Sequence, residues 1–370
     1  MMRLAFLALL LLSGAAVAAE PLRIGIIAPT TGPIATIGAR QLSAVKWWQH
    51  SIDAAGGIDG RQVELLSCND EGNPEKAVNC ARDLLSRGVI LLLNSSVTGP
   101  IRATMPLVEH GPVMLTPSPN VLPPASGFVF QTSASDADLT QAIADYMHES
   151  KVDQIGIIAA TDASGEVGVA SAAAVFPANH IRYDLARIDP RANDASVQLS
   201  DVARGKKIIY SNYSGAGAAA VVKSYANLGL EQPLLISYAN ISDAFIALIK
   251  DDMPPRLLGT AIRAVSPALI TDAAERRHLS EFQQSYEAWS HDKADSLTLQ
   301  GLILADVAEA ILRHVPNPGD PAAVKAFLES TPIQSVQTIS FSPRRHIGMD
   351  ASGIAIVEWK DGSWIKAGPL

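Results

Sequence analysis

Short apolar, β-branched runs alternate along the chain with longer stretches whose apolar positions repeat at helical spacing. The short runs are nearly continuously apolar, which is typical of parallel strands buried on both faces of a sheet. Repeated strand–helix–strand order predicts an α/β fold. The strands are too numerous for one small doubly wound sheet, so we expect two such sheets in series.

The expected elements fall into two series. The first series of strands comprises Leu22–Ala28, Gln62–Ser67, Val89–Leu93, Val113–Thr116 and Phe128–Gln131. The second comprises Gln154–Ala159, Lys206–Tyr210, Pro233–Ile236 and Leu257–Ala261. The expected helices are Ala39–Ala54, Pro74–Arg87, Ala137–Ser150, Ala216–Gly229, Ala273–Ser290 and Ala294–His314. Two later strand-like pieces, Gln337–Phe341 and Gly353–Trp359, indicate that the chain crosses back between two domains near its end.

The first nineteen residues have the features of a secretory signal peptide. Arg3 gives a basic start, Leu4–Leu12 is an unbroken apolar run, and Ala16-Val17-Ala18 resembles a cleavage site. A membrane span needs about 20 residues, so this run is too short to be one. The alternative is a buried N-terminal helix. We expect cleavage near Ala18 and export to an oxidising compartment.

Export changes the interpretation of the two cysteines, Cys68 and Cys80. The first ends an expected strand and the second lies in the next expected helix. In an oxidising compartment, this arrangement favours a disulfide between strand and helix. Two buried free thiols remain the alternative, and the spacing is not that of a C-x-x-C redox pair.

Composition and missing motifs exclude several classes of protein. Of the 370 residues, 48% are hydrophobic and 18% charged, which excludes a disordered chain. The net charge of -8 argues against nucleic acid as a partner. The histidines lack metal-ligand spacing and there is no G-x-S-x-G elbow. We expect no enzymatic activity, no cofactor and no metal.

One motif resembles a dinucleotide-binding fingerprint. Gly215–Ala220 reads G-x-G-x-x-A and follows an expected strand. Four residues separate that strand from the first glycine, however, and small residues suit any tight turn between a strand and a helix. An enzyme that uses this turn is therefore a minor alternative.

Polar turns follow several expected strands. In open parallel sheets, ligands bind beyond the carboxyl ends of the strands, where helix N-termini offer free N–H groups. These turns are Pro29–Pro33, Asn94–Pro100, Pro117–Asn120, Ser211–Ser214 and Ser237–Asn240. Ordinary turn chemistry is the alternative, because Ser, Asn and Gly dominate turns in general.

The segment Gly25–Leu93 resembles the N-terminal part of the leucine/isoleucine/valine-type periplasmic binding proteins of ABC transporters, which have the type I periplasmic-binding fold. The matching motifs are Thr31-Gly32-Pro33, the block D-A-A-G-G-I-D-G-R at 53–61, and N-D-E-G-N-P at 69–74. Ser95-Ser96, Thr116-Pro117-Ser118, Phe130–Ser133 and Gly165-Glu166 then match in order. The resemblance covers essentially the whole mature chain.

The resemblance implies two doubly wound parallel-sheet lobes joined by three crossover strands, near 133–137, 260–264 and 333–338. It implies one lobe at 20–134 plus 262–334 and another at 135–261 plus 335–370. A small-molecule ligand would sit between the lobes, which close on it by a hinge. The loaded protein, a monomer in the periplasm, would then dock on membrane permease subunits.

Departures from the family pattern bear on the ligand. The family's second-lobe glutamate, which holds the ligand ammonium, corresponds to Ala239 here. Two family tyrosines correspond to Ile37 and Ser164, and a family arginine to Gln131. An unpaired buried ammonium is costly. We therefore expect a carboxylic or aromatic acid, or a neutral amide-like solute, rather than an α-amino acid.

The expected ligand-binding residues follow from the same alignment. Ser95, Ser96 and Ser118 would donate to a carboxylate or carbonyl, with Ser95 and Ser96 using both hydroxyl and backbone N–H. Tyr213 and Tyr238 would close from the second lobe. Asp162 offers a substitute negative charge for an amino compound. A ligand-sensing module, or a branched-chain amino acid binder with a rearranged site, are the alternative functions.

Overall fold

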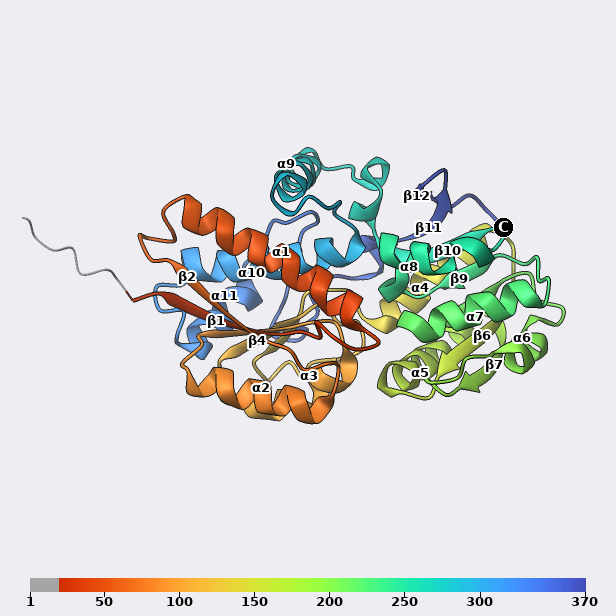
Figure 1. Cartoon of the computed structure of the whole chain (residues 1–370), viewed down its shortest axis with the longest axis horizontal. Helices are drawn as coiled ribbons and strands as arrows, with labels where there is room; N and C mark the ends of the chain where they lie inside the picture. Colours follow the sequence, from red (N-terminus) through yellow and green to blue (C-terminus); the bar gives the residue numbers. More distant parts are fainter. Residues whose placement is uncertain (1–19) are drawn as a thin grey trace, which may run out of the picture.

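The computed structural model describes residues 20–370, so the predicted signal peptide and its cleavage site lie outside the described residues. Figure 1 shows two bodies side by side, each built from a sheet and its covering helices. The predicted α/β fold with two sheets in series is confirmed. Within 20–370, no helix combines the length and the apolar character needed to cross a membrane.

The first sheet has five parallel strands in the order β2-β1-β3-β4-β5. They are β1 (Leu22–Ile27), β2 (Val63–Cys68), β3 (Leu91–Asn94), β4 (Val113–Thr116) and β5 (Val129–Gln131). One face packs on α1 (Ala35–Ala54), α10 (Ser296–His314) and α11 (Pro321–Ser330), and α9 (Ala273–Ser290) joins the same core by packing against α1. The other face packs on α2 (Pro74–Ser86), α3 (Thr98–Thr104) and the 3-10 helix η1 (Met105–Val108). Burial on both faces explains why β3 and β4, which are buried along their whole length, are almost entirely apolar.

The second sheet has seven strands in the order β12-β11-β10-β9-β8-β6-β7. They are β6 (Gln154–Ala160), β7 (Arg182–Ile188), β8 (Ile209–Asn212), β9 (Leu234–Ile236), β10 (Leu257–Ile262), β11 (Ile354–Lys360) and β12 (Ser363–Lys366). The strands from β10 to β7 are parallel, whereas β11 and β12 add an antiparallel ribbon at one edge. One face packs on α4 (Asp136–Glu149) and α5 (Ala163–Ala178). The other packs on α6 (Ser196–Ala203), α7 (Gly215–Asn227) and α8 (Asp243–Ile249).

Short 3-10 turns complete the second half of the chain. They are η2 (Tyr238–Asn240), η3 (Lys250–Asp252), η4 (Arg263–Val265), η5 (Pro267–Leu269) and η6 (Ala351–Gly353).

Three connections join the two bodies, which we call the first and second lobes. They run from β5 to α4, from β10 to α9, and from α11 to β11. The first and third connections lie side by side. The Gln131 N–H donates to the carbonyl of His346, and the Gly348 N–H donates to the carbonyl of Gln131, each at 2.8 Å. The exact residues proposed from the sequence as lobe boundaries remain predictions.

The structure differs from the expected strands in three places. Gln337–Phe341 is not a strand, because only an isolated bridge pairs Ile339 with Ile333. Its apolar side chains instead enter the core of the first lobe. Strand β7 was not expected, because its sequence R-Y-D-L-A-R-I mixes charged and apolar residues along the edge of the sheet. The structure also places β8 at Ile209–Asn212, three residues later than the predicted start.

The predicted disulfide is confirmed. Cys68 and Cys80 are bonded, with their Cα atoms 5.7 Å apart. The bond ties the end of β2 to α2, and no free cysteine lies within residues 20–370. The alternative of two free thiols is therefore excluded for this structure.

Candidate functional site

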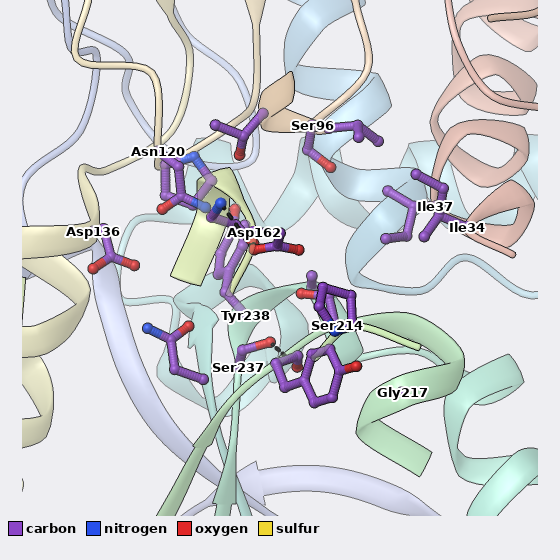
Figure 2. A pocket seen from close by; sticks show the side chains of 18 of the residues that line it. Ile34, Ile37, Ser96, Asn120, Asp136, Asp162, Ser214, Gly217, Ser237 and Tyr238 are labelled. Atoms are coloured by element: carbon purple, nitrogen blue, oxygen red, sulfur yellow. Dashed lines mark hydrogen bonds between the residues drawn. The ribbon is translucent and has the colours of Figure 1, made fainter. Parts of the chain in front are cut away.

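A cavity of about 310 Å³ lies between the two lobes, where turns at the carboxyl ends of strands from both sheets face each other. The first lobe contributes Pro33, Ile34, Ile37, Ser96, Val97, Thr98, Pro119 and Asn120. The start of α4 contributes Asp136 and Leu139. The second lobe contributes Asp162, Ser164, Pro190, Arg191, Tyr210, Asn212, Tyr213, Ser214, Ala216, Gly217, Ser237, Tyr238 and Ala239. Figure 2 shows that apolar, hydroxyl, amide and carboxylate side chains share this lining.

Four of the six predicted ligand-binding residues line this cavity, namely Ser96, Asp162, Tyr213 and Tyr238. Ser95 and Ser118 do not line it, and both are buried beneath the turns. The Ser95 N–H donates to the Ile27 carbonyl at 2.9 Å, and the Ser118 N–H donates to Thr116 Oγ1 at 3.3 Å. In this structure, both serines therefore support the turns from below.

Ser96 is fixed by a side chain that the sequence did not point to. The Gln41 amide nitrogen donates to Ser96 Oγ at 2.8 Å, and the Ser96 N–H donates to Gln41 Oε1 at 3.0 Å. The same Gln41 nitrogen lies 2.8 Å from Gln300 Oε1. The backbone N–H of Ser96 is thus occupied, contrary to the expectation that it faces the ligand. Its hydroxyl accepts from Gln41 and keeps its own proton free to donate.

Tyr213 explains the G-x-G-x-x-A motif without a dinucleotide. Its hydroxyl donates to the Asp189 carbonyl at 3.1 Å, and its ring packs on the first turn of α7. A Cβ atom at Gly217 would lie 2.3 Å from Cζ of this ring, so only glycine allows the contact. Burial, together with the negative charges of Asp162 and Asp189, raises the pKa of Tyr213 to about 12.

Tyr238 presents a buried hydroxyl that has no hydrogen-bond partner within residues 20–370. Burial raises the pKa of Tyr238, so its hydroxyl remains a neutral donor at physiological pH. The turns beside it are cross-linked. The Asn240 amide donates to the Tyr213 carbonyl at 2.7 Å, and the Ser237 hydroxyl donates to the same oxygen at 3.0 Å. These bonds fix the turns that carry Tyr213 and Tyr238 relative to each other.

Asp162 caps the N-terminus of α5. Its Oδ1 accepts the N–H groups of Ser164 at 3.0 Å and Gly165 at 2.8 Å. This is ordinary N-cap geometry, and the residue is exposed. Asp162 thus brings a negative charge to the rim of the cavity while its carboxylate is already partly satisfied.

Asp136 lines the cavity and was missed by sequence reasoning. It is the first residue of α4 and only 5% exposed, and its Oδ2 has no hydrogen-bond partner in the described residues. Burial raises the pKa of Asp136 to about 6, and the nearby Ser171 hydroxyl offsets part of the rise. Its backbone N–H donates to the Pro119 carbonyl at 2.9 Å, which links α4 to the first lobe. The sequence did offer one indication of this residue, since Asp136 is an acid within the first crossover expected near 133–137.

Other lining residues were also missed. Asn120 and Asn212 lie in turns that sequence analysis singled out, but without a role for either side chain. Arg191 follows the unexpected strand β7, and Tyr210 lies inside a strand rather than after it. The Asn120 Oδ1 atom is buried without a partner in the described chain, as is the Tyr238 hydroxyl. A ligand is the natural partner for such atoms, because buried polar groups are rarely left unpaired.

The whole fold matches one family of proteins. The family model of the periplasmic binding proteins matches residues 21–363. The chain belongs to this family. It is similar to the Leu/Ile/Val-binding protein homolog 3 of Brucella melitensis, with 24% identity over 358 residues that span 94% of each chain. The predicted resemblance to the branched-chain amino acid type of periplasmic binding protein is thereby confirmed.

Several solved structures share the fold at low sequence identity. Rp1789 of Rhodopseudomonas palustris superposes with a TM-score of 0.84, 19% identity, and coverage of 94% of this chain and 100% of that one. An ABC transporter solute-binding protein of R. palustris, in complex with benzoate, has a TM-score of 0.76, 20% identity, and coverage of 94% and 96%. A branched-chain amino acid transporter substrate-binding protein of Streptococcus pneumoniae, in complex with isoleucine, has a TM-score of 0.78, 14% identity, and coverage of 94% and 100%.

These comparisons establish the general class of function. Periplasmic binding proteins bind small molecules and work with the permeases of ABC transporters, as substrate-binding proteins rather than enzymes. The structural neighbours bind chemically different ligands, an aromatic acid in one case and an amino acid in another. Membership of the family therefore leaves the ligand of this chain to be argued from its own cavity.

Proposed function

We propose that this periplasmic binding protein delivers a small organic acid to an ABC uptake permease, and that its lobes close on the ligand by a hinge. The observation that carries the proposal is the cavity between the lobes, which is lined by residues of both. A ligand that contacts both lobes binds the closed state better than the open state, and it shifts the population accordingly.

The lining favours a ligand with one carboxylate and an apolar or aromatic body. The hydroxyls of Tyr238 and Ser96 are the donors that a carboxylate would accept. Ile34, Ile37 and Val97 offer apolar surface on the first-lobe side. The tyrosine rings of the second lobe add flat aromatic surface. This combination of an apolar lining with a few convergent polar groups is typical of small-molecule sites.

The residue at position 239 argues against the usual ligand of the branched-chain amino acid type. Ala239 lines the cavity where the resemblance expects a glutamate that holds the ligand ammonium. An organic acid without an α-amino group needs no such partner. Benzoate, the ligand of one structural neighbour, is an acid of this kind.

A branched-chain amino acid is the second candidate. It is favoured by the name of the Brucella relative and by the carboxylates of Asp136 and Asp162, which line the cavity at other positions than 239. In that case the site is rearranged, and one of these two residues holds the ammonium.

Thermal unfolding with a panel of solutes tests the proposal. The panel contains aromatic acids, aliphatic acids, simple amides and branched-chain amino acids. A ligand at 100 times its Kd stabilises the folded state by about 2.7 kcal/mol, which raises Tm by several degrees. We expect the shift with carboxylic acids. A shift with leucine or valine alone would support the second candidate, and no shift with any acid would contradict the proposed ligand class.

The same measurement with Tyr238→Phe tests the binding mode. Loss of the hydroxyl donor should weaken the affinity for the best acid about tenfold, because one hydrogen bond to a charged group is lost. Tyr183→Phe, on β7 outside the cavity lining, is the matched control and should leave the affinity unchanged. Equal affinities for all three proteins would place the carboxylate elsewhere.

A further inference from the structure

We propose that the Asp136 carboxylate accepts a hydrogen bond from the ligand, so that the preferred solute carries a hydroxyl or amino donor in addition to its carboxylate. The inference rests on the proposed function and specifies the ligand further. Its basis is a buried carboxylate that lines the cavity and has an oxygen without a partner.

No cation of the described chain compensates Asp136. Arg191, the basic residue of the cavity lining, pairs with Asp189 at 3.0 Å and is largely exposed. Arg345, on the third connection, donates to Asp138 at 2.9 Å and to the Met349 carbonyl at 2.8 Å. The negative charge of Asp136 is thus stabilised only by its place at the N-terminus of α4 and by the nearby Ser171 hydroxyl.

Asp136 lines the cavity together with Tyr210. Burial and the negative charge of Asp136 both raise the pKa of Tyr210. A buried carboxylate without sufficient partners is costly in a protein interior. Because Asp136 lies on the wall of the cavity, a ligand bound there can supply that donor.

Asp162, the other acid of the lining, is a weaker acceptor for the ligand. It already accepts the Ser164 and Gly165 N–H groups, and it is exposed to solvent. A new hydrogen bond to Asp162 would replace one to water and gain little. A bond to the buried carboxylate of Asp136 would instead satisfy an oxygen, Oδ2, that has no partner in the described chain.

The positions of the lining residues fit a ligand with a polar and an apolar end. Figure 2 shows Asp136 on one side of the cavity and the pair Ile34 and Ile37 on the opposite side. Ser96 and Asn120 lie along the edge between them in this view. A ligand with a donor near Asp136 can therefore still place its apolar part against the two isoleucines.

Matched ligands that differ only in the donor provide the test. One set is 4-methylpentanoate, 2-hydroxy-4-methylpentanoate and leucine, and the other is benzoate, 4-hydroxybenzoate and 4-aminobenzoate. Isothermal titration calorimetry with the mature wild-type protein measures each Kd. We expect a donor-bearing member to bind about 10- to 100-fold more tightly than its unsubstituted parent, as one charge-assisted hydrogen bond implies.

The variants Asp136→Asn and Asp136→Ala separate this role from a structural one. Both should lose most of the preference for the donor-bearing ligand, whereas the unsubstituted acid should bind equally well or better, since a negative charge has been removed. Asp153→Asn, which removes an exposed carboxylate from the same lobe, is the matched control. The Tm of each unliganded variant shows that it is folded.

The outcomes are distinct. If the unsubstituted acids bind as tightly as the donor-bearing ones, or if both lose affinity equally in the Asp136 variants, this inference is wrong while the proposed function stands. If no acid of either set binds, the proposed ligand class fails as well. A preference that is larger for leucine than for 2-hydroxy-4-methylpentanoate, and that disappears in Asp136→Asn, identifies a cationic donor.

Discussion

At the scale of single residues, the cavity lining includes buried polar atoms that no other atom of the described chain satisfies. Asp136 Oδ2, Asn120 Oδ1 and the Tyr238 hydroxyl are buried without partners in the described chain. Each such group costs free energy until a ligand supplies the missing hydrogen bond. Residues that serve binding in this way should therefore lower the stability of the empty protein, so that their removal stabilises it.

Asp136 allows a direct check of this expectation, because the direction of its pKa shift determines whether its charge stabilises or destabilises the folded protein. Burial raises this pKa from 3.8 to about 6, so the folded state binds a proton more tightly than the unfolded state. The resulting penalty is absent below pH 4, grows as the pH rises towards 6, and is complete above it. It amounts to about 3 kcal/mol at most.

Asp136→Asn should therefore raise the free energy of unfolding of the unliganded protein at pH 7 by up to about 3 kcal/mol, and the gain should shrink between pH 6 and pH 4. Urea unfolding at several pH values measures both effects. A variant that is less stable than wild type at pH 7, or a gain that does not depend on pH, would contradict this account.

How far the sequence predicts the site also differs between residues. Ser96, Asp162, Tyr213 and Tyr238 follow expected strands, and the family resemblance together with the rule that ligands bind beyond strand ends led to them. Asp136 was missed because it is the first residue of α4, next to the capping box of Ser135 and Asp138. Acidic residues are common at that place in a helix, so its sequence position did not indicate a role in binding. Gln41 could not be predicted, because its role depends on contacts with turns distant in the sequence.

At the scale of helices and strands, patterns with strong periodicity were predicted well. Helix α9 spans the predicted residues, and β4 does as well. Helix α5 was missed because its sequence is small and apolar on all sides, which gives no polar stripe. Strand β7 was missed for the opposite reason, since its charged residues suit the exposed edge of a sheet rather than a buried core.

The disulfide between β2 and α2 is a prediction at this scale. Cysteine alkylation followed by mass spectrometry of the mature exported protein should detect no free thiol, because the two cysteines are bonded to each other. Replacing both with serine should lower the free energy of unfolding by about 2–4 kcal/mol, since the bond restricts the conformations of the unfolded chain. Two alkylated thiols in the unreduced protein, or an unchanged stability of the double variant, would contradict the expectation.

At the scale of the whole molecule, the two lobes meet again beside the cavity. A gap there is lined by Thr36 of α1 in the first lobe, by Leu248 of α8 in the second, and by neighbouring residues of both. Near it, a Cβ atom on Gly215 would lie 3.4 Å from Ile34 of the opposite lobe. The width of this gap should therefore report on the closure of the lobes.

Spin labels at Thr36→Cys and Leu248→Cys can measure that closure, since the native cysteines are held in a disulfide. Pulsed dipolar spectroscopy should give a shorter and narrower distance distribution after a binding acid is added, because the closed state gains its contacts from the ligand. Labels at Val197 and Leu248, both within the second lobe, are the control and should not change. Identical distributions with and without ligand for the first pair would contradict hinge closure.

The pairing of the first and third connections has a mechanical consequence. Because Gln131 exchanges two backbone hydrogen bonds with residues 346–348, we expect these two connections to move together in the proposed hinge closure. In a rotation, displacement grows with distance from the axis. Asp136 follows closely on the first connection, whereas Thr36 and Leu248 line the gap between the lobes. If the lobes close as proposed, the Asp136 carboxylate should move less than these two residues, so that a solute could bind it before the gap narrows.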